Sequence, residues 1–195
     1  MSVAASAKAV ARRSVESAAR LIARAQVAAL ARSLGSTPRV VLDIDNTLAD
    51  TWPSFLVPHA SHRERLAGLA PLPNIKAVAH DTAVADGSAV IFLSHRNLWD
   101  RPVTLRWLRT HGFAATRGNV VLVPSPADKV ALVSALARGG SVTVWDDLTH
   151  GHETGTVGYY DDVIEAVTRA SATYHGWADI VAVTGSSGES VPERE

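Results

Sequence analysis

The sequence predicts an α/β protein with a doubly wound, mainly parallel sheet and an added N-terminal helix. Short apolar runs rich in valine alternate along the chain with longer stretches of helical pattern. The expected strands are 39–43, 88–93, 119–123 and 141–145, and the expected helices between them are 74–85, 102–112 and 127–138. Strands that are separated by helices pair in parallel, because each helix carries the chain back to the same edge. Open sheets of this kind bind ligands beyond the carboxyl ends of their strands.

The composition supports a folded domain and excludes several classes of site. The chain has 195 residues, of which 47% are hydrophobic and 19% are charged, so it can bury a sizeable core. Nineteen basic residues balance nineteen acidic ones, which argues against a broad electrostatic surface for nucleic acid or anionic membrane. The absence of cysteine excludes disulfides, thiolate zinc sites, iron–sulfur clusters and cysteine nucleophiles. Since no uncharged apolar run approaches the ~20 residues that cross a bilayer, we expect no membrane span and a cytoplasmic protein.

Residues 1–36 differ in charge from the rest of the chain and are expected to form a helical extension. They contain six basic residues and a single acidic residue, Glu16. They are rich in alanine, which favours helix, so we expect one long helix or a helical pair over 4–34 that ends near Gly35. Three interpretations of this extension remain open: a helix that packs on the domain or on a second copy in a homo-oligomer, an arm that binds a partner or nucleic acid, and a transit peptide.

The remaining chain divides into an expected domain over 37–184 and an expected disordered tail over 185–195. Within the domain, the residues that follow the fourth strand predict a helix over 160–173. Residues 177–183 fit either a last strand or a packed tail. The tail is rich in glycine, serine and charged residues, a composition typical of disordered chain ends.

Two acidic residues close the first predicted strand. Asp43 and Asp45 are two positions apart, so strand alternation directs both side chains to one face. Two carboxylates this close repel each other unless a cation or a proton separates them, which indicates a functional site rather than core packing. A calcium loop is an alternative, but it needs further oxygen ligands at alternate positions and a closing glutamate. Leu48 and Ala49 supply none of these ligands.

Four segments resemble, in order, the motifs of the haloacid dehalogenase (HAD) superfamily. The first is Val40-Val-Leu-Asp43-Ile-Asp45-Asn46-Thr47-Leu48, and the second is Leu93-Ser94-His95-Arg96. The third is Lys129 at the start of a predicted helix, and the fourth is Asp146-Asp147 after the fourth predicted strand. The resemblance covers about residues 39–150. It implies a Rossmann-like core and a magnesium-dependent phosphatase.

The resemblance implies a role for each motif residue. It makes Asp43 the nucleophile that takes the phosphoryl group, and Asp45 the general acid and then the base, for which we expect a raised pKa. Ser94 would donate to a phosphoryl oxygen and Lys129 would balance the carboxylates. The implied Mg²⁺ ligands are Asp43, Asp45 through its backbone carbonyl, Asp146 and Asp147, with the direct ligand of the last pair left open. The implied substrate contacts are Thr47, Ser94, His95 and Arg96.

Several of these residues also have an ordinary structural interpretation. Ser94 can be a helix N-cap, Lys129 a solvated helix residue, and the Asp146–Asp147 pair the cap of the next element. His150 and His152 are two positions apart in a glycine-rich loop, where solvent-facing histidines are commoner than metal ligands. Trp52 lies just beyond the first motif and is expected either to shield the site or to pack.

The expected site is open, because no full cap domain fits between the motifs. The stretches from Thr47 to Ser94 and from Ser94 to Lys129 are each filled by the predicted elements. A capless site suits a macromolecular end, a protein phosphoester, or a small substrate enclosed by a neighbouring subunit. The expected partner is therefore a phosphorylated substrate of unknown class, with nucleic acid expected only as substrate.

Two other functions remain open besides a phosphomonoester hydrolase. One is a catalytically weak or regulatory protein that binds a partner through the basic N-terminal helix. The other is a phosphotransferase that passes the phosphoryl group to an acceptor other than water. The intact Asp43, Asp45, Lys129 and Asp147 favour catalysis over a purely regulatory role.

Overall fold

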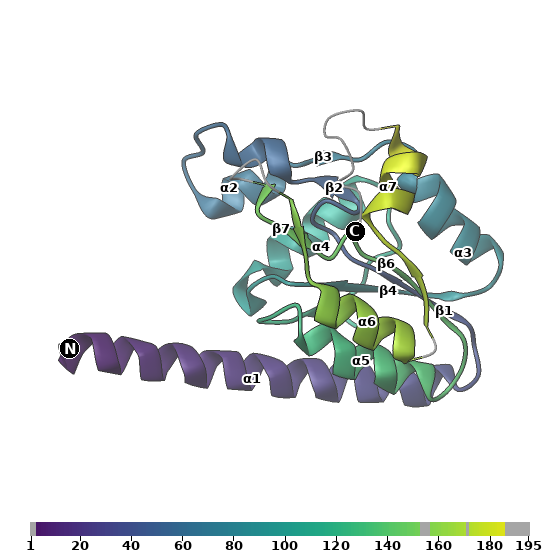
Figure 1. Ribbon diagram of the computed structural model, residues 1–195, viewed down its shortest axis with the longest axis horizontal. Helices are drawn as coiled ribbons and strands as arrows, with labels where there is room; N and C mark the ends of the chain where they lie inside the picture. Colours follow the sequence, from purple (N-terminus) through teal and green to yellow (C-terminus); the bar gives the residue numbers. More distant parts are fainter. Residues whose placement is uncertain (1–2, 153–156, 171, 186–195) are drawn as a thin grey trace.

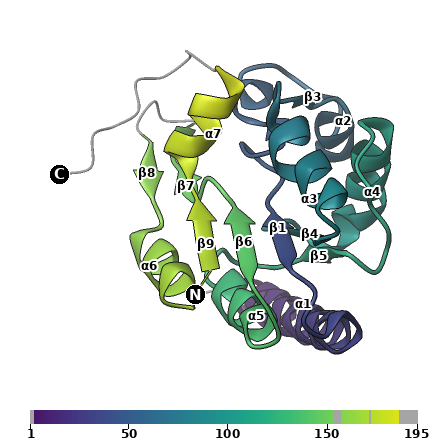
Figure 2. The ribbon, with the colours of Figure 1, turned by 90° about the vertical axis from the view of Figure 1, so that its right-hand side faces the viewer.

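Five parallel strands form the central sheet of the computed structural model, which describes residues 3–152, 157–170 and 172–185. The strand order is β5-β4-β1-β6-β9, with β1 at the centre (Figure 2). The strands are β1 (Arg39–Leu42), β4 (Ala89–Ser94), β5 (Val120–Leu122), β6 (Val142–Trp145) and β9 (Ala172–His175). Every neighbouring pair is parallel, as helical crossovers require. The predicted α/β fold class is confirmed.

Helices cover both faces of this sheet. One face carries α1 (Val3–Leu34), α5 (Asp128–Ala137) and α6 (Asp161–Arg169). The other face carries the π-helical turn η2 (Lys76–Asp81), α3 (Thr82–Ala85), α4 (Arg101–Thr110) and α7 (Trp177–Thr184) (Figure 2). Successive residues of β1 supply the two sides: Val41 packs with Val27 of α1, whereas Leu42 packs with Leu108 of α4. Because both faces are buried, the strands read as continuous apolar runs rather than alternating ones.

Residues 49–71, which we call the flap, leave the sheet after β1 and return before η2. The flap begins and ends in two short strands, β2 (Ala49–Asp50) and β3 (Ala70–Pro71), which pair antiparallel. Between them lie the 3₁₀ turn η1 (Trp52–Phe55) and helix α2 (His62–Ala67). The remaining short elements are η3 (Leu98–Asp100) and the paired strands β7 (Thr149–His150) and β8 (Gly158–Tyr159).

The structure corrects the sequence-based expectation in the C-terminal part of the chain. The expected helix over 160–173 ends at Arg169, and the last strand is β9 at 172–175. Residues 177–184 form helix α7 rather than a last strand, and this helix packs on the domain, as the alternative of a packed tail expected. Ile180 of α7 is buried among residues of the α4 side of the sheet, so its apolar character reflects a packed helix, which periodicity cannot distinguish from a strand over so short a run. Most of the expected disordered tail, 186–195, lies outside the described residues.

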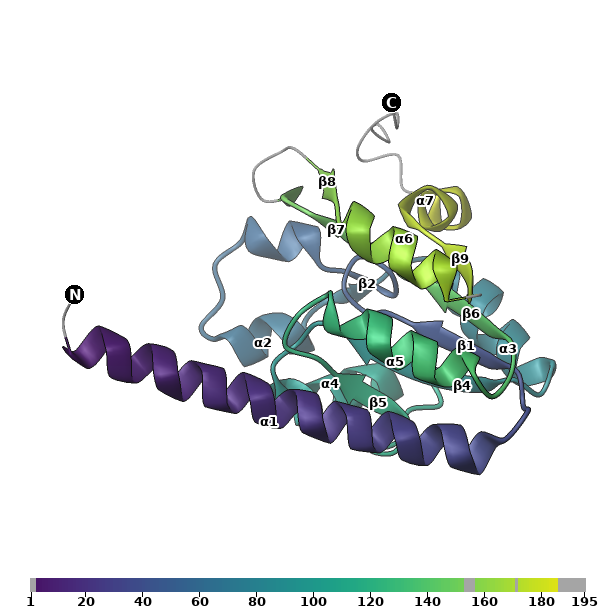
Figure 3. The same cartoon turned by 60° about the horizontal axis from the view of Figure 1, so that its bottom comes forward.

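Helix α1 is a single long helix, and its C-terminal part packs on the domain. Ala23 and Val27 are each 1% exposed and join the core between the sheet and α5. Arg20 Nε donates to both carboxylate oxygens of Asp128 at the start of α5, at 2.9 and 3.0 Å. The N-terminal part of the helix extends past the domain (Figures 1 and 3). Although α1 has 32 residues, no helix among the described residues is both long and apolar enough to cross a membrane.

We expect Val27→Ala to destabilise the protein, because it removes two buried methyl groups from the contact between α1 and the sheet. The expected loss is about 2 kcal/mol in the free energy of unfolding, or about 4–8 °C in Tm for a chain of this size. Val10→Ala is the matched control, since Val10 lies on the same helix and is 55% exposed. Equal effects of the two changes in thermal denaturation would show that α1 does not dock as described.

Candidate functional site

The predicted site residues converge at the carboxyl edge of the sheet. Asp43 follows β1, Ser94 ends β4 and Asp146 follows β6. Since β4, β1 and β6 are neighbours in the sheet, these three strand ends lie side by side. They line a cavity of about 460 Å³, together with Asp147, Lys129 and residues of the flap. The convergence follows from parallel pairing, which brings the carboxyl ends of strands to one edge.

The local backbone explains why both acidic residues of the first motif reach the cavity. Ile44, between them, is fully buried in the core on the α4 side, whereas Asp43 and Asp45 both line the cavity. The chain then turns sharply: Ala49 N donates to Ile44 O at 2.8 Å, and Asn46 adopts a left-handed conformation with φ 53°. Asparagine tolerates this conformation better than most residues. The turn therefore redirects the chain just beyond the end of β1 at Leu42.

Three carboxylates and one ammonium group form a buried charged cluster in the cavity. Lys129 Nζ lies 2.6 Å from Asp146 Oδ2 and 3.0 Å from Asp43 Oδ1. Asp43, Asp146 and Asp147 each offer one oxygen, and these oxygens all lie within 4.8 Å of one another. All four residues are at most 5% exposed. With three negative charges and one positive charge, the cluster carries an excess of negative charge that favours a divalent cation or added protons.

Burial changes the acidity of this cluster. Burial raises the pKa of Asp146, and the adjacent Lys129 only partly offsets this effect. Burial also raises the pKa of Asp147, and the charges of Asp146 and Asp43 add to the shift. In the opposite direction, Asp146 and Asp43 outweigh burial at Lys129 and raise its pKa, so the ammonium group stays charged. A cation bound among the carboxylates would reverse the shifts of Asp146 and Asp147, because it favours their charged forms.

Two threonines hold Asp147 in place. Thr47 Oγ1 donates to Asp147 Oδ1 at 3.3 Å and accepts from the Asp147 backbone N–H at 3.1 Å. Thr149 Oγ1 donates a short hydrogen bond to Asp147 Oδ2. Thr47 is fully buried and contacts a carboxylate of the cluster, whereas the sequence assigned it to the substrate. Because threonines supply only neutral donors, they orient Asp147 without neutralising it.

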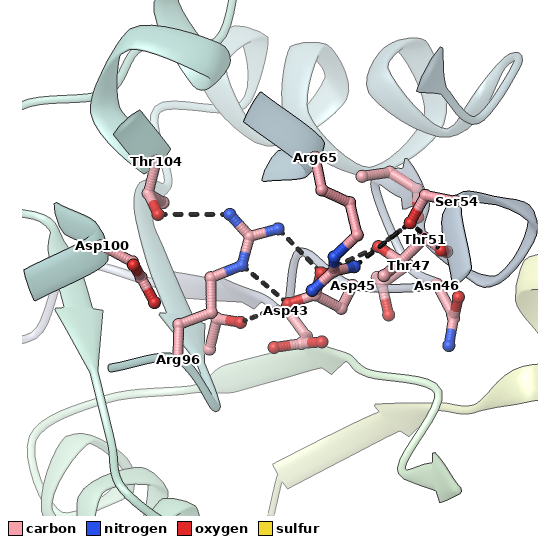
Figure 4. Close-up of polar contacts among 12 residues, drawn as sticks. Asp43, Asp45, Asn46, Thr47, Thr51, Ser54, Arg65, Arg96, Asp100 and Thr104 are labelled. Atoms are coloured by element: carbon pink, nitrogen blue, oxygen red, sulfur yellow. Dashed lines mark hydrogen bonds and ion pairs between the residues drawn. The ribbon is translucent and has the colours of Figure 1, made fainter. Parts of the chain in front are cut away.

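Asp45 forms a separate ion pair with Arg96, away from Lys129. Arg96 Nε donates to Asp45 Oδ2 and Nη2 donates to Oδ1, both at 2.7 Å (Figure 4). Thr104 Oγ1 accepts from Arg96 Nη1 at 3.2 Å, and Thr51 Oγ1 donates to Asp45 Oδ1 at 2.8 Å. This two-pronged geometry is the strongest form of an arginine–carboxylate contact.

The Arg96 contact overturns the expected acidity of Asp45. Burial alone raises the pKa of Asp45, but the charge and hydrogen bonds of Arg96 outweigh burial and lower the pKa below its usual value. The role implied by the resemblance required a raised pKa of Asp45, which we expected from its crowded and partly desolvated position. The sequence could not predict that a guanidinium 51 positions away would bind the carboxylate on both oxygens.

The other residues of the second motif lie beside this ion pair. Ser94 Oγ is 3.4 Å from Asp45 Oδ2, and Ser94 lines the cavity. His95 also lines the cavity and is exposed, with Nε2 3.1 Å from Pro124 O. Arg96 lines the cavity as well, but its guanidinium is turned toward Asp45. Ser94 is therefore not a helix N-cap, and the second motif places a hydroxyl, a ring and a guanidinium at one edge of the cavity.

The loop after the fourth motif contributes two histidines, His150 and His152, to the cavity wall. His152 is 5% exposed, and its Nε2 lies 2.7 Å from Thr149 Oγ1. Its ring centroid is 6.1 Å from that of Trp52 in the flap. Among the described residues, the group with metal-binding geometry contains neither His150 nor His152.

Apart from Trp52, sequence reasoning did not single out the residues of the flap that form the cavity wall. Phe55, His62 and Arg65 line the cavity, and Asp100 of η3 faces His62, with Asp100 Oδ2 3.1 Å from His62 Nε2. No motif marks these residues, and each is of a common surface type. Only the folding of the flap over the carboxyl edge brings them to the site.

We expect the metal-free protein to lose stability as the pH rises, because Asp146 and Asp147 have raised pKa values of about 7 and about 8. The folded protein then binds more protons than the unfolded chain between pH ~4 and ~8, so unfolding becomes easier as these protons are lost. Each kcal/mol lost lowers Tm by about 2–4 °C. Thermal denaturation between pH ~6 and ~9 should show this fall, and excess Mg²⁺ should oppose it most at the high end.

Asp147→Asn is the control for that measurement. It removes the titrating group while it keeps a side chain of similar size, so the fall in Tm with pH should become shallower. A Tm independent of pH in the metal-free wild type, or a Mg²⁺ effect as large at pH ~5 as at pH ~9, would contradict the buried cluster.

Comparison with known proteins identifies a shared fold. No protein-family model matches this chain, and no curated protein matches it in sequence. The class C acid phosphatase from Bacillus anthracis has a TM-score of 0.52 and 16% sequence identity, over 91% of this chain and 84% of that chain. A structure of that phosphatase with tungstate bound has a TM-score of 0.50 and 16% identity, over 90% and 84% of the two chains. At this identity, the likeness establishes that this chain shares the α/β fold of an acid phosphatase.

Proposed function

We propose that this protein is a Mg²⁺-dependent phosphomonoester hydrolase that forms a phosphoryl intermediate on Asp43. The observation that carries the proposal is the buried cluster of Asp43, Asp146, Asp147 and Lys129 beside Asp45 at the carboxyl edge. The order of the four motifs, which resembles the HAD superfamily, supports it. The fold that the chain shares with an acid phosphatase supports it as well.

The donor set of the cluster fits a magnesium ion. Mg²⁺ prefers oxygen ligands and binds through one or two carboxylates, water and substrate phosphate. Asp43, Asp146 and Asp147 would hold it, with the backbone carbonyl of Asp45, and Thr47 and Thr149 would orient Asp147. Both members of the Asp146–Asp147 pair line the cavity. When bound, the ion would supply charge neutralisation for the phosphoryl oxygens.

The residues of the chain divide the reaction between them. A carboxylate oxygen of Asp43 attacks phosphorus, forms the new P–O bond and displaces the leaving-group oxygen, which takes a proton from Asp45. Asp45 then removes a proton from water, which attacks the aspartyl phosphate and releases phosphate with free Asp43. Ser94 donates to a phosphoryl oxygen, and Lys129 supplies a fixed positive charge where negative charge develops.

Arg96 sets the protonation of Asp45 in this scheme. In the resting site, Asp45 is paired with Arg96 and its pKa is lowered. A phosphate dianion entering beside Arg96 competes for the guanidinium and adds negative charge near Asp45. Both effects raise the pKa of Asp45, so substrate binding itself favours the protonated acid that the first step needs.

The site in this proposal is capless, and the flap forms part of the wall over the cavity. The flap carries one short helix, α2, of 6 residues, too small to form a separate cap domain. Trp52 and Phe55 of the flap line the cavity. The flap can therefore shield one side of the bound phosphate and contact the leaving group.

We expect purified protein to hydrolyse p-nitrophenyl phosphate with added Mg²⁺ and to lose this activity on chelation. Asp43→Asn should lower kcat on the order of 10³-fold or more, because it removes the nucleophile. Asp86→Asn, an exposed acidic residue outside the cavity, is the control and should leave kcat unchanged. Full activity in Asp43→Asn would rule out the phosphoaspartate route, and product analysis with added alcohols would reveal a phosphotransferase.

We expect Asp45→Asn to slow alkyl phosphates more than aryl phosphates. An alkoxide leaving group needs a proton from Asp45, whereas p-nitrophenolate leaves without one. The loss with glycerol 2-phosphate should be about 10²–10⁴-fold, and the loss in the first step with p-nitrophenyl phosphate should be much smaller. Burst kinetics separate that step from hydrolysis of the intermediate. Equal losses in the first step for both substrates would show that Asp45 is not the general acid.

A further inference from the structure

The inner wall of the flap presents a cation that the proposed reaction does not use. Arg65, on α2, lines the cavity and is half-buried. Its Nη1 donates to Ser54 Oγ at 3.1 Å, and its Nη2 lies 3.4 Å from His62 Nδ1. Its guanidinium carbon sits 4.2 Å above the centre of the Phe55 ring. These contacts with a hydroxyl, an imidazole ring and an aromatic face hold the guanidinium in one place.

Arg65 has no carboxylate partner of its own within the described part of the chain. The ion pairs found there, with N–O distances up to 4.0 Å, do not include it. The two nearby carboxylates are already bound elsewhere: Asp45 by Arg96 and Asp100 by His62. A guanidinium in a cavity wall that has no carboxylate partner is available to a ligand anion.

The position of Arg65 relates it to the leaving group rather than to the metal cluster. The charges that act on it are those of Asp45, Arg96 and Asp100. Asp45 is the residue that would protonate the leaving-group oxygen, while Asp43, Asp146, Asp147 and Lys129 form the cluster that would hold the metal ion. In the close-up, the Arg65 side chain reaches from the flap toward Asp45 (Figure 4). In the proposed reaction, groups on the Arg65 side of Asp45 would face the leaving group of the substrate.

From these contacts we infer that Arg65 recognises a second anionic group on the leaving group of the substrate. The substrate is then a phosphomonoester that also carries a carboxylate or a second phosphate, and Phe55 borders its carbon skeleton. This inference rests on the proposed phosphatase function and narrows its substrate class. A carboxylate and a phosphate each present two oxygens that a guanidinium can bind through two N–H groups.

The test compares substrates that differ only in the second anion. One pair is 2-phosphoglycerate and glycerol 2-phosphate, and another is 3-phosphoglycerate and glycerol 3-phosphate. A third pair, adenosine 3′,5′-bisphosphate and adenosine 5′-monophosphate, replaces the carboxylate by a phosphate. We expect kcat/KM to be about 10–100-fold higher for the substrate with the second anion in at least one pair. This is the range of one charge-assisted contact.

Variants of α2 assign this preference to Arg65. Arg65→Gln should reduce the ratio of kcat/KM within the preferred pair to about 1, and Arg65→Lys should leave an intermediate ratio, since it keeps the charge but loses the two-pronged geometry. Arg63→Gln is the matched control, because Arg63 is exposed on the same helix and does not line the cavity. Its ratio should equal that of the wild type. Circular dichroism and Tm verify that each variant is folded.

The possible results separate this inference from the proposed function. The inference is supported if the protein prefers the substrate with the second anion, Arg65→Gln removes this preference and Arg63→Gln keeps it. No preference in any pair, or a preference unchanged in Arg65→Gln, overturns it while the phosphatase proposal stands. Failure of the wild-type protein with Mg²⁺ to hydrolyse any of these substrates or p-nitrophenyl phosphate overturns both.

Discussion

The site depends on burying three carboxylates around a single ammonium group. Asp43, Asp146 and Asp147 are held close together out of water, and only Lys129 compensates them. An uncompensated buried charge is costly, so the chain must enforce this arrangement through rigid elements. It does so by placing the acidic residues at the ends of adjacent central strands and the lysine in the first turn of α5. The remaining imbalance is what makes the cluster suitable for a divalent cation.

The ion pair of Asp45 and Arg96 lies beside this cluster and, unlike the cluster, has no excess of negative charge. Asp45 and Arg96 neutralise each other through two short hydrogen bonds, so this half of the site is internally satisfied at rest. The contrast assigns different chemistry to the two halves. The unbalanced cluster favours a cation. In the proposed reaction it also receives the phosphoryl group, and an entering phosphate dianion would compete with Asp45 for Arg96. Acidic residues of one cavity can thus have opposite pKa shifts: the pKa is raised at Asp146 and Asp147 and lowered at Asp45.

The N-terminal helix and the flap add to this core in different ways. The C-terminal part of α1 supplies Ala23 and Val27 to the core beneath the sheet, and Arg20 anchors it to α5 at Asp128, next to Lys129. The flap, on the carboxyl side, supplies polar and aromatic groups to the cavity wall instead. The helix therefore stabilises the elements that carry the charged cluster, and the flap forms part of the cavity wall beside that cluster.

The order of strands and helices, and the acidic and polar residues at the strand ends, were determined by the sequence itself. Apolar runs and their spacing are local properties, and parallel pairing follows from the helices between the strands. Tertiary structure alone decided the partner of Asp45, the position of Arg65 in the wall, and the choice of 172–175 rather than 177–183 as the last strand. These outcomes depend on contacts between residues tens of positions apart. A local sequence pattern does not predict which of several distant side chains of the same type will form a hydrogen bond with a given residue.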